Sequence, residues 1–436
     1  MQLLIYTPRI TPRVEYIFST LLTAIGVQEF QLTQDVEFYN NAAGYKINYS
    51  AAYADEEILW IEPADLLFEK EIKEQKTAVF PWNETKLFFK TVNGDLPFDI
   101  FAASFYLITR YEEYLPHKPD MYGRYAHENS LAFKEGFLNT PLVNIWLQQF
   151  VKLVLKKFPF LHLLPKTFHF LPTYDIDIAW SYLHKGWRRN AGGLVRAMVN
   201  REWATVKQRI KVLFGNEKDP FDSYEWLDEL HKKNRLEPQY FFLLAQQNKD
   251  YDKNILSKKK ALQKLIQQHC SKYAIGIHPS WQSGDKPGLL KEEIKILEKI
   301  IGKKVNKSRQ HYIRMALPDT YQRLIAAGIT EDYSMGYGSI NGFRASYCLP
   351  YKWYDLKKNE ATSLTLFPFC FMDANSYYEQ HYTAEEGLNE MEQYYKITKE
   401  VNGLFVTIWH NHFLGTDKMF EGWQEYKTVI EKICNG

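Results

Sequence analysis

The chain alternates short apolar runs with longer amphipathic segments from residue 166 onward, and this alternation constrains the fold more than any other feature. The apolar runs are rich in β-branched and aromatic residues, which is typical of buried strands. Strands are expected at residues 168–174, 239–244, 273–277, 310–313, 329–332, 364–369 and 405–409. Amphipathic helices are expected between most of them, at residues 257–269, 289–301, 318–327 and 384–401. The pattern predicts a parallel sheet or barrel with helices outside it, and places any chemistry at the carboxyl ends of the strands.

The length of 436 residues exceeds what one ordinary core supports, so we expect two domains. We expect residues 1–165 to form a smaller α/β domain of unknown role and residues 166–436 to form the second domain. In the first domain, strands are expected at 3–6, 45–49 and 58–61, and helices at 12–25, 98–115 and 141–158. We expect Arg110, Glu112 and Glu113 to form an ion-pair cluster on the surface rather than a functional site.

Composition excludes some classes of function. The net charge of +2 gives no support for binding to nucleic acid. The 4 cysteines are not spaced as metal ligands or as a redox pair, which favours a reducing compartment. The first residues lack the pattern of a secretory leader, and no stretch of about 20 apolar residues could span a bilayer. We therefore expect a cytoplasmic protein.

Polar side chains follow several of the expected strands. Asp175 and Asp177 end the first strand, His278 follows the third, and His410 ends the last. Residues at i and i+2 of a strand point to the same side, and two neighbouring carboxylates repel unless a cation or a shared proton lies between them. This geometry suits a metal ion beside a general base. The alternative for the two aspartates is an Asp-rich turn, and we expect Asp332 to cap a turn.

The motifs at these strand ends resemble those of the polysaccharide deacetylases, the NodB-like family of metal-dependent carbohydrate esterases. The resemblance covers roughly residues 168–436 and keeps the order of the family's motifs. The matching stretches are Thr173-Tyr-Asp175-Ile-Asp177, Gly276-Ile-His278-Pro-Ser-Trp-Gln282, Arg309-Gln-His-Tyr312, Glu331-Asp332-Tyr-Ser334 and Val406-Thr-Ile-Trp-His410. The resemblance implies an irregular (β/α) barrel.

The resemblance also implies roles for particular residues. Asp175 would be the general base, Asp177 and His278 would bind a divalent metal, most simply zinc, and His410 would protonate the leaving amine. Arg309 would orient Asp175. Substrate contacts are predicted for Arg344, Tyr312, His412 and Trp409.

Two positions depart from the family pattern. Gln282 stands where the family has its second metal histidine, and His311 stands where it has a proline. Because glutamine is a poor zinc ligand, the metal site either recruits another ligand, for which His412 and His311 are the candidates, or is weak or absent.

Two functions from different classes follow. The first is a metal-dependent hydrolase that removes N-acetyl groups from a glycan or a lipid-linked sugar precursor, with an acetylated carbohydrate as its partner. The second is a catalytically inactive carbohydrate-binding or assembly protein that keeps the fold, which Gln282 favours. The same chemistry on another amide, such as a ureide, is a third option.

The segment 181–215 is strongly basic. It holds eight Lys or Arg residues and one acid, Glu202, which gives +7 against +2 for the whole chain. Trp187, Trp203 and several aliphatic residues are interleaved with these charges. Such a segment is most often a solvated insertion, and the alternative is peripheral contact with an anionic membrane.

Overall fold

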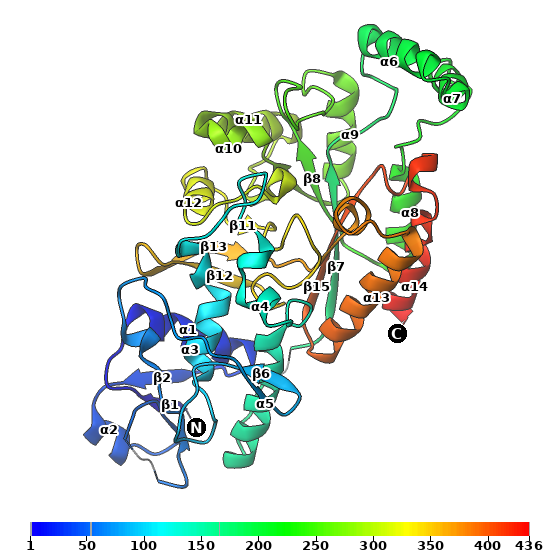
Figure 1. Cartoon of the computed structure of the whole chain (residues 1–436). Helices are drawn as coiled ribbons and strands as arrows, with labels where there is room; N and C mark the ends of the chain where they lie inside the picture. The colour runs from blue at the N-terminus through cyan, green and yellow to red at the C-terminus, as the bar shows by residue number, and fades with distance from the viewer. Residues whose placement is uncertain (1, 53–54, 165, 436) are drawn as a thin grey trace.

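The computed structural model describes residues 2–52, 55–164 and 166–435, and in these ranges the fold is mixed α/β. The predicted domain boundary at residue 165 lies outside the described residues, and the division into two domains stays a prediction. Two separate sheets lie on either side of this position, one with four strands and one with nine (Figure 1).

The N-terminal sheet is parallel, and its strands run in the order β2-β1-β3-β4. The strands are β1 (Leu3–Tyr6), β2 (Phe30–Thr33), β3 (Tyr45–Asn48) and β4 (Leu59–Trp60), and a separate antiparallel pair is formed by β5 (Phe80–Trp82) and β6 (Thr85–Leu87). The helices of this part are α1 (Pro12–Ala24), α2 (Val36–Asn41), α3 (Ile100–Ile108), α4 (Leu131–Lys134) and α5 (Leu142–Lys157). The sequence predictions for β1, α1 and α5 are confirmed to within a residue or two.

Helix α3 is shorter than its apolar pattern predicts. The chain leaves the helix at Thr109, and Arg110 adopts a left-handed conformation with φ 55°. A short 3₁₀ turn at Tyr111–Tyr114 continues the helical spacing of side chains. The periodicity therefore persisted beyond the end of the α-helix.

The larger sheet has nine strands in the order β12-β13-β11-β10-β9-β8-β7-β15-β14, and all of its pairings except β12 with β13 are parallel. The strands are β7 (His169–Ile176), β8 (Gln239–Leu243), β9 (Ala274–His278), β10 (Lys307–Ser308), β11 (Glu331–Asp332), β12 (Tyr351–Asp355), β13 (Glu360–Leu366), β14 (Phe371–Met372) and β15 (Leu404–His410). The strand predicted at 310–313 is wrong. Tyr312 takes φ 60°, which a strand does not allow, and a 3₁₀ turn at His311–Ile313 stands there instead.

The predicted barrel is not seen as a closed hydrogen-bonded ring among the described strands. One segment nevertheless joins the two ends of the sheet, because β13 pairs with β11 and β14, a few residues later, pairs with β15. Between them the Phe367 amide donates to the Asp332 carbonyl oxygen, and the Cys370 amide donates to the Val406 carbonyl oxygen. The carboxyl ends of the parallel strands therefore meet around one region.

Helices cover this sheet, as Figure 1 shows. They are α8 (Tyr224–Asn234), α9 (Lys260–Cys270), α10 (Trp281–Asp285), α11 (Pro287–Ile301), α12 (Asp319–Ala326), α13 (Ala384–Glu400) and α14 (Tyr426–Asn435). Two further helices, α6 (Trp187–Val199) and α7 (Trp203–Leu213), lie side by side at the upper right of Figure 1, away from the rest of the chain.

In the described parts of the chain, no helix combines the length and the apolar composition needed to cross a bilayer. The cysteines Cys270, Cys348, Cys370 and Cys434 are all free thiols.

A buried ion-pair network joins the two parts of the chain and corrects two predictions. Arg110 is 1% exposed and donates to Glu112 and Glu113, so the cluster is not on the surface. Arg344 donates to Glu113 through Nε at 2.8 Å and Nη2 at 2.6 Å, in the bidentate geometry that suits guanidinium and carboxylate. Arg110 also donates to the Arg344 carbonyl oxygen. The network therefore fixes the end of α3 against the loop before β12.

Candidate metal and catalytic site

The predicted polar residues meet in a cavity of about 480 Å³ at the carboxyl ends of β7, β9 and β15. Asp175 is paired in register with His410 across β7 and β15, and His278 is paired with Leu243 across β8 and β9. Parallel strands in register present their last residues at one edge of the sheet. For this reason Asp175, Asp177, His278 and His410 all line one cavity.

Asp175 is held in place by Arg309. The Arg309 Nη1 donates to Asp175 Oδ1 at 2.9 Å, and both side chains are buried. Arg309 is itself fixed because its Nε donates to the Tyr333 carbonyl oxygen at 3.0 Å. The carboxylate of Asp175 therefore has a permanent cationic partner on one oxygen, while Oδ2 lies 3.8 Å from His278 Nε2.

In the part of the chain that the structure describes, Asp177, His278 and His311 form a group that could hold a metal ion. Their ligand atoms all lie within 4.8 Å of one another. Asp177 Oδ1 is 3.2 Å from His278 Nε2, and Oδ2 is 3.6 Å from His311 Nε2. Burial by itself would raise the pKa of Asp177, but His311 and His278 hold this pKa well below its ordinary value. The charged form of the aspartate, which is the form that binds metal, is thus favoured.

The two histidines are oriented by partners on their far nitrogens. His278 Nδ1 lies 2.6 Å from the Arg309 carbonyl oxygen, and His311 Nδ1 lies 2.9 Å from Asp252 Oδ1. Both partners accept hydrogen bonds, so each Nδ1 donates and each Nε2 faces Asp177. Burial lowers the pKa of His311, but Asp177 and Asp252 raise it to about 9. Metal-binding histidines commonly have such a second partner.

Gln282 supports the site without pointing into it. Its Nε2 donates to Asp252 Oδ2 at 3.0 Å and to the Gln247 carbonyl oxygen at 3.1 Å. Asp252 in turn holds His311. Of the two candidates for a further ligand, His311 and not His412 lies within 4.8 Å of the ligand atoms of Asp177 and His278.

His410 forms a buried pair with Asp373. His410 Nδ1 lies 2.6 Å from Asp373 Oδ1, and the His410 amide donates to Oδ2 at 2.7 Å. Burial lowers the pKa of His410, but the charge of Asp373 raises it to about 10. His410 Nε2 faces the cavity, 3.6 Å from Asp177 Oδ2. The arrangement provides a protonated imidazole beside the candidate metal ligands.

The other candidate ligand, His412, lies apart from the three. It lines the cavity, but its ring packs against Phe221, Phe413 and Phe420. Burial lowers its pKa to about 3, so it is neutral.

Asp332 caps a turn as predicted, because it accepts hydrogen bonds from the amide and hydroxyl of Ser334.

Aromatic rings form one wall of the cavity. Tyr122, Tyr251, Trp281 and Tyr312 form a cluster with ring centroids 4.3–5.9 Å apart. Tyr312, a predicted substrate contact, is 37% exposed and lines the cavity. Tyr122 comes from the N-terminal part of the chain, where Arg124 donates to the Tyr312 carbonyl oxygen at 2.7 Å. The N-terminal part thus contributes directly to the cavity.

Two predicted substrate contacts do not reach the cavity. Arg344 is 1% exposed, and its guanidinium is occupied by Glu113 and the Gly336 carbonyl oxygen. Trp409 is fully buried and packs against Trp423 and Tyr426, because alternate side chains of β15 point away from the site. Neither residue is in a position to touch a substrate.

The sequence reasoning missed Asp252, Asp373, Tyr122 and Tyr251. Asp373 follows the apolar run Cys370-Phe-Met, so the same strand-end rule that found Asp175 could have found it. The other three lie in connections without periodicity, and no sequence signal pointed to them.

Residues 3–159 match the model of a family of unknown function, DUF7033. No curated protein matches the chain. Partial likenesses exist among solved structures. One is a protein from Mycobacterium smegmatis assigned to the polysaccharide deacetylases, with 14% identity, a TM-score of 0.40, and coverage of 62% of this chain and 84% of that one.

A polysaccharide deacetylase from Bacillus cereus has 9% identity, a TM-score of 0.31, and coverage of 61% of this chain and 88% of that one. A 4-α-glucanotransferase from Thermococcus litoralis has 11% identity, a TM-score of 0.37, and coverage of 62% of this chain and 37% of that one. At such TM-scores these likenesses do not identify the function, which has to come from the site itself.

Proposed function

We propose that this protein is a metal-dependent hydrolase that removes N-acetyl groups from a glycan or a lipid-linked sugar precursor in the cytoplasm. One observation carries the proposal. A carboxylate fixed by arginine, Asp175, and an imidazole fixed by carboxylate, His410, flank three potential metal ligands in one cavity. We further propose that the larger sheet is an irregular (β/α) barrel of the deacetylase type, whose ends are joined through residues 360–372.

The three residues fit a divalent metal, zinc most simply. Asp177 Oδ1 is buried and makes no hydrogen bond among the described residues, so this oxygen is free to bind a cation. Two imidazoles with fixed Nδ1 donors and one carboxylate are a ligand set that zinc accepts, with a position left open for water. When bound, such a metal lowers the pKa of its water and polarises the amide carbonyl.

The side chains around the metal position have complementary tasks. Asp175 accepts the proton of the attacking water, and Arg309 keeps the carboxylate turned toward the cavity. His410 donates a proton to the leaving nitrogen, because an amine is a far better leaving group than its anion. The aromatic wall of Tyr122, Tyr251 and Tyr312 offers rings for the apolar face of a sugar.

The alternative function is carbohydrate binding without catalysis. It predicts that sugars bind to the cavity while no acetate is released. The position of His311 beside Asp177 and His278 supports the hydrolase over this alternative, because it offers a third potential ligand where Gln282 does not.

The test begins with metal content. The purified protein is expected to retain about one zinc after reconstitution, measured by mass spectrometry. An Asp177→Ala/His278→Ala variant and a His311→Asn variant are expected to lose it. His412→Asn is the matched control, because it removes an imidazole from the same cavity outside the three ligands, and is expected to keep the metal.

Acetate release from acetylated glycans then tests the catalytic roles. Asp175→Asn is expected to retain the metal and to lower kcat about 10²-fold or more, because the general base is removed. Metal loss in His412→Asn but not in His311→Asn would contradict the ligand assignment. Metal and sugar binding without any acetate release would select the non-catalytic alternative.

A further inference from the structure

Helices α6 and α7 form a hairpin that the rest of the protein does not cover. The buried residues of α6 are Asn190 and Ala197, and the buried residue of α7 is Val212. The hairpin begins ten residues after Asp177, in the connection that follows β7, and projects from the body of the molecule (Figure 1). Apart from these three, the residues of both helices are exposed or half-buried.

Each helix carries an apolar stripe that is left exposed. Trp187, Leu194 and Met198 of α6 recur at i, i+7 and i+11, which places them on one face. Trp203, Ile210 and Phe214 repeat the same spacing along and just after α7. Trp187 is 76% exposed, Trp203 is 63% exposed and Phe214 is 78% exposed. Large apolar side chains exposed together in this way indicate an interaction surface.

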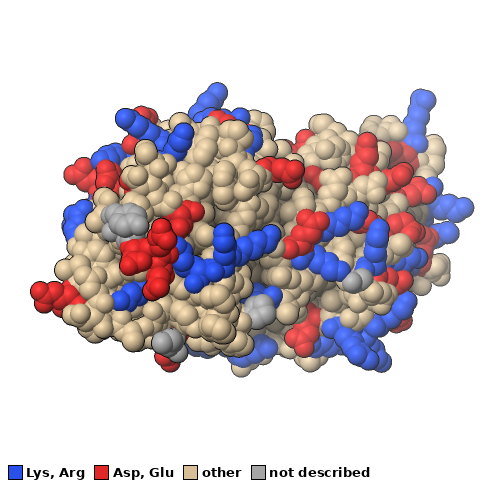
Figure 2. All heavy atoms as spheres, turned by 90° about the horizontal axis from the view of Figure 1, so that it is seen from below, with Lys and Arg blue, Asp and Glu red and all other residues tan. Residues whose placement is uncertain are grey.

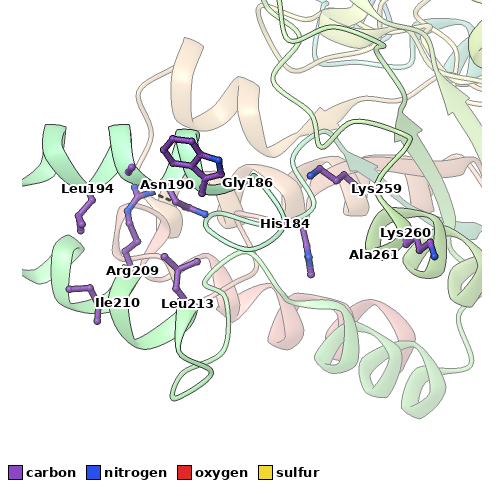
Figure 3. A pocket seen from close by; sticks show the side chains of 12 residues that line it. His184, Gly186, Asn190, Leu194, Arg209, Ile210, Leu213, Lys259, Lys260 and Ala261 are labelled. Atoms are coloured by element: carbon purple, nitrogen blue, oxygen red, sulfur yellow. Dashed lines mark hydrogen bonds between the residues drawn. The ribbon is translucent and has the colours of Figure 1, made fainter.

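Trp187 and Leu194 of the first stripe and Ile210 of the second line a groove of about 710 Å³. In Figure 3 the apolar side chains Leu194, Ile210 and Leu213 lie on one side of it. His184, Lys259 and Lys260 lie on the other side, nearer to α9. The groove therefore combines apolar and cationic side chains, since Arg209 lies beside Leu194 and Ile210, and Lys259 and Lys260 lie opposite.

Positive charge surrounds these stripes. The segment 181–215 carries +7, and Glu202 is its one acid. Arg188, Arg196, Arg201 and Lys207 are exposed, and across the described ranges no carboxylate lies within ion-pair distance of them. By contrast, the face seen in Figure 2 shows Lys and Arg interspersed with Asp and Glu. The cationic surface of the hairpin is thus a local feature.

We propose that the hairpin α6–α7 docks the protein onto the surface of an anionic phospholipid bilayer. Tryptophan and aliphatic stripes beside unpaired arginines match the apolar and anionic layers of a lipid surface. If the segment were a solvated insertion, Trp187, Trp203 and Phe214 would stay exposed to water at a cost in free energy. If it bound nucleic acid, the aliphatic stripes would remain in water. The docking does not depend on the hydrolase activity, so each can fail separately.

Co-sedimentation of the full-length protein with vesicles tests the docking. Binding is expected to vesicles of phosphatidylcholine and phosphatidylglycerol in equal amounts, and to fall at high salt. Arg188→Glu/Arg189→Glu is expected to weaken binding about thirtyfold or more, because each basic residue near such a surface contributes a factor of about five. The matched control Lys291→Glu/Lys295→Glu makes the same charge change on exposed positions of α11 and is expected to bind normally.

The apolar contribution is tested separately. Trp203→Ser/Phe214→Ser is expected to weaken vesicle binding about tenfold or more, because two large side chains no longer enter the lipid. Phe160→Ser, at a position that is 90% exposed elsewhere on the molecule, is the control. Melting temperatures and circular dichroism of all variants confirm that the fold is retained.

Four results would overturn the proposal. The first is no binding to anionic vesicles at low salt, and the second is equal binding to pure phosphatidylcholine. The third is a dimer in solution that dissociates in Trp203→Ser/Phe214→Ser, which would assign the groove to a second copy of the chain. The fourth is binding to duplex DNA without vesicle binding, which would assign the charge to nucleic acid.

Discussion

Replacing Glu113 with alanine tests the claim that a buried ion pair holds the two parts of the chain together. Glu113 accepts two hydrogen bonds from Arg344 and one from Arg110, and all three side chains are buried. Its loss leaves two guanidinium groups without their shared carboxylate. Breaking a buried pair from one side costs about 3–5 kcal/mol, because the remaining charge is desolvated and uncompensated.

The pKa of Glu113 gives a second value for the stability that this carboxylate contributes. Burial raises this pKa, but Arg344 and Arg110 lower it from 4.5 to about 2. At 1.36 kcal/mol per pKa unit, this lowering of the pKa corresponds to about 3 kcal/mol of stability. Because the folded-state pKa is the lower one, this contribution is fully present above pH 4.5 and is lost as the pH falls toward 2.

Urea unfolding at pH 7 measures the free energy of unfolding of the wild type and of Glu113→Ala. Glu225→Ala is the control, because its side chain is 81% exposed, and it is expected to stay within about 0.5 kcal/mol of the wild type. The difference between wild type and Glu113→Ala is expected to shrink as the pH is lowered from 4.5. A cost below about 1 kcal/mol at pH 7, or a cost that does not change with pH, would refute the reasoning.

Two further predictions concern the cavity, and a third concerns the buried Trp409. Asp252→Asn is expected to lower zinc affinity about 10–100-fold in a competition titration, because it weakens the hold on His311, and unchanged affinity would show that the Asp252 contact is dispensable. Tyr122→Ala is expected to raise KM for an acetylated sugar several-fold with little change in kcat, because it removes a ring of the wall; a loss confined to kcat would contradict this role. Trp409→Phe is expected to lower the free energy of unfolding by about 1–3 kcal/mol while KM stays unchanged, since the ring is in the core, and a rise in KM would restore the predicted substrate contact.

Local sequence predicted the elements that depend on periodicity and on turn residues. The helix Pro12–Ala24 begins where Thr11 caps it, and the strand-end positions of Asp175, Asp177, His278 and His410 follow from the alternation of strands and helices. These four residues meet because parallel strands in register share one edge, which is a property of the sheet and needs no detail of packing. The sequence thus determined the polar residues that the strand ends bring to the cavity.

The tertiary structure alone decided the third candidate ligand and the supports of the site. His311 reaches Asp177 from a 3₁₀ turn where a strand was expected, and Asp252 and Gln282, distant in sequence, converge to hold it. It also decided that Arg344 and Trp409 are buried and that Tyr122 reaches the cavity from the N-terminal part. Such contacts join residues far apart in the chain, and neither periodicity nor turn chemistry carries information about which distant side chains will pack together.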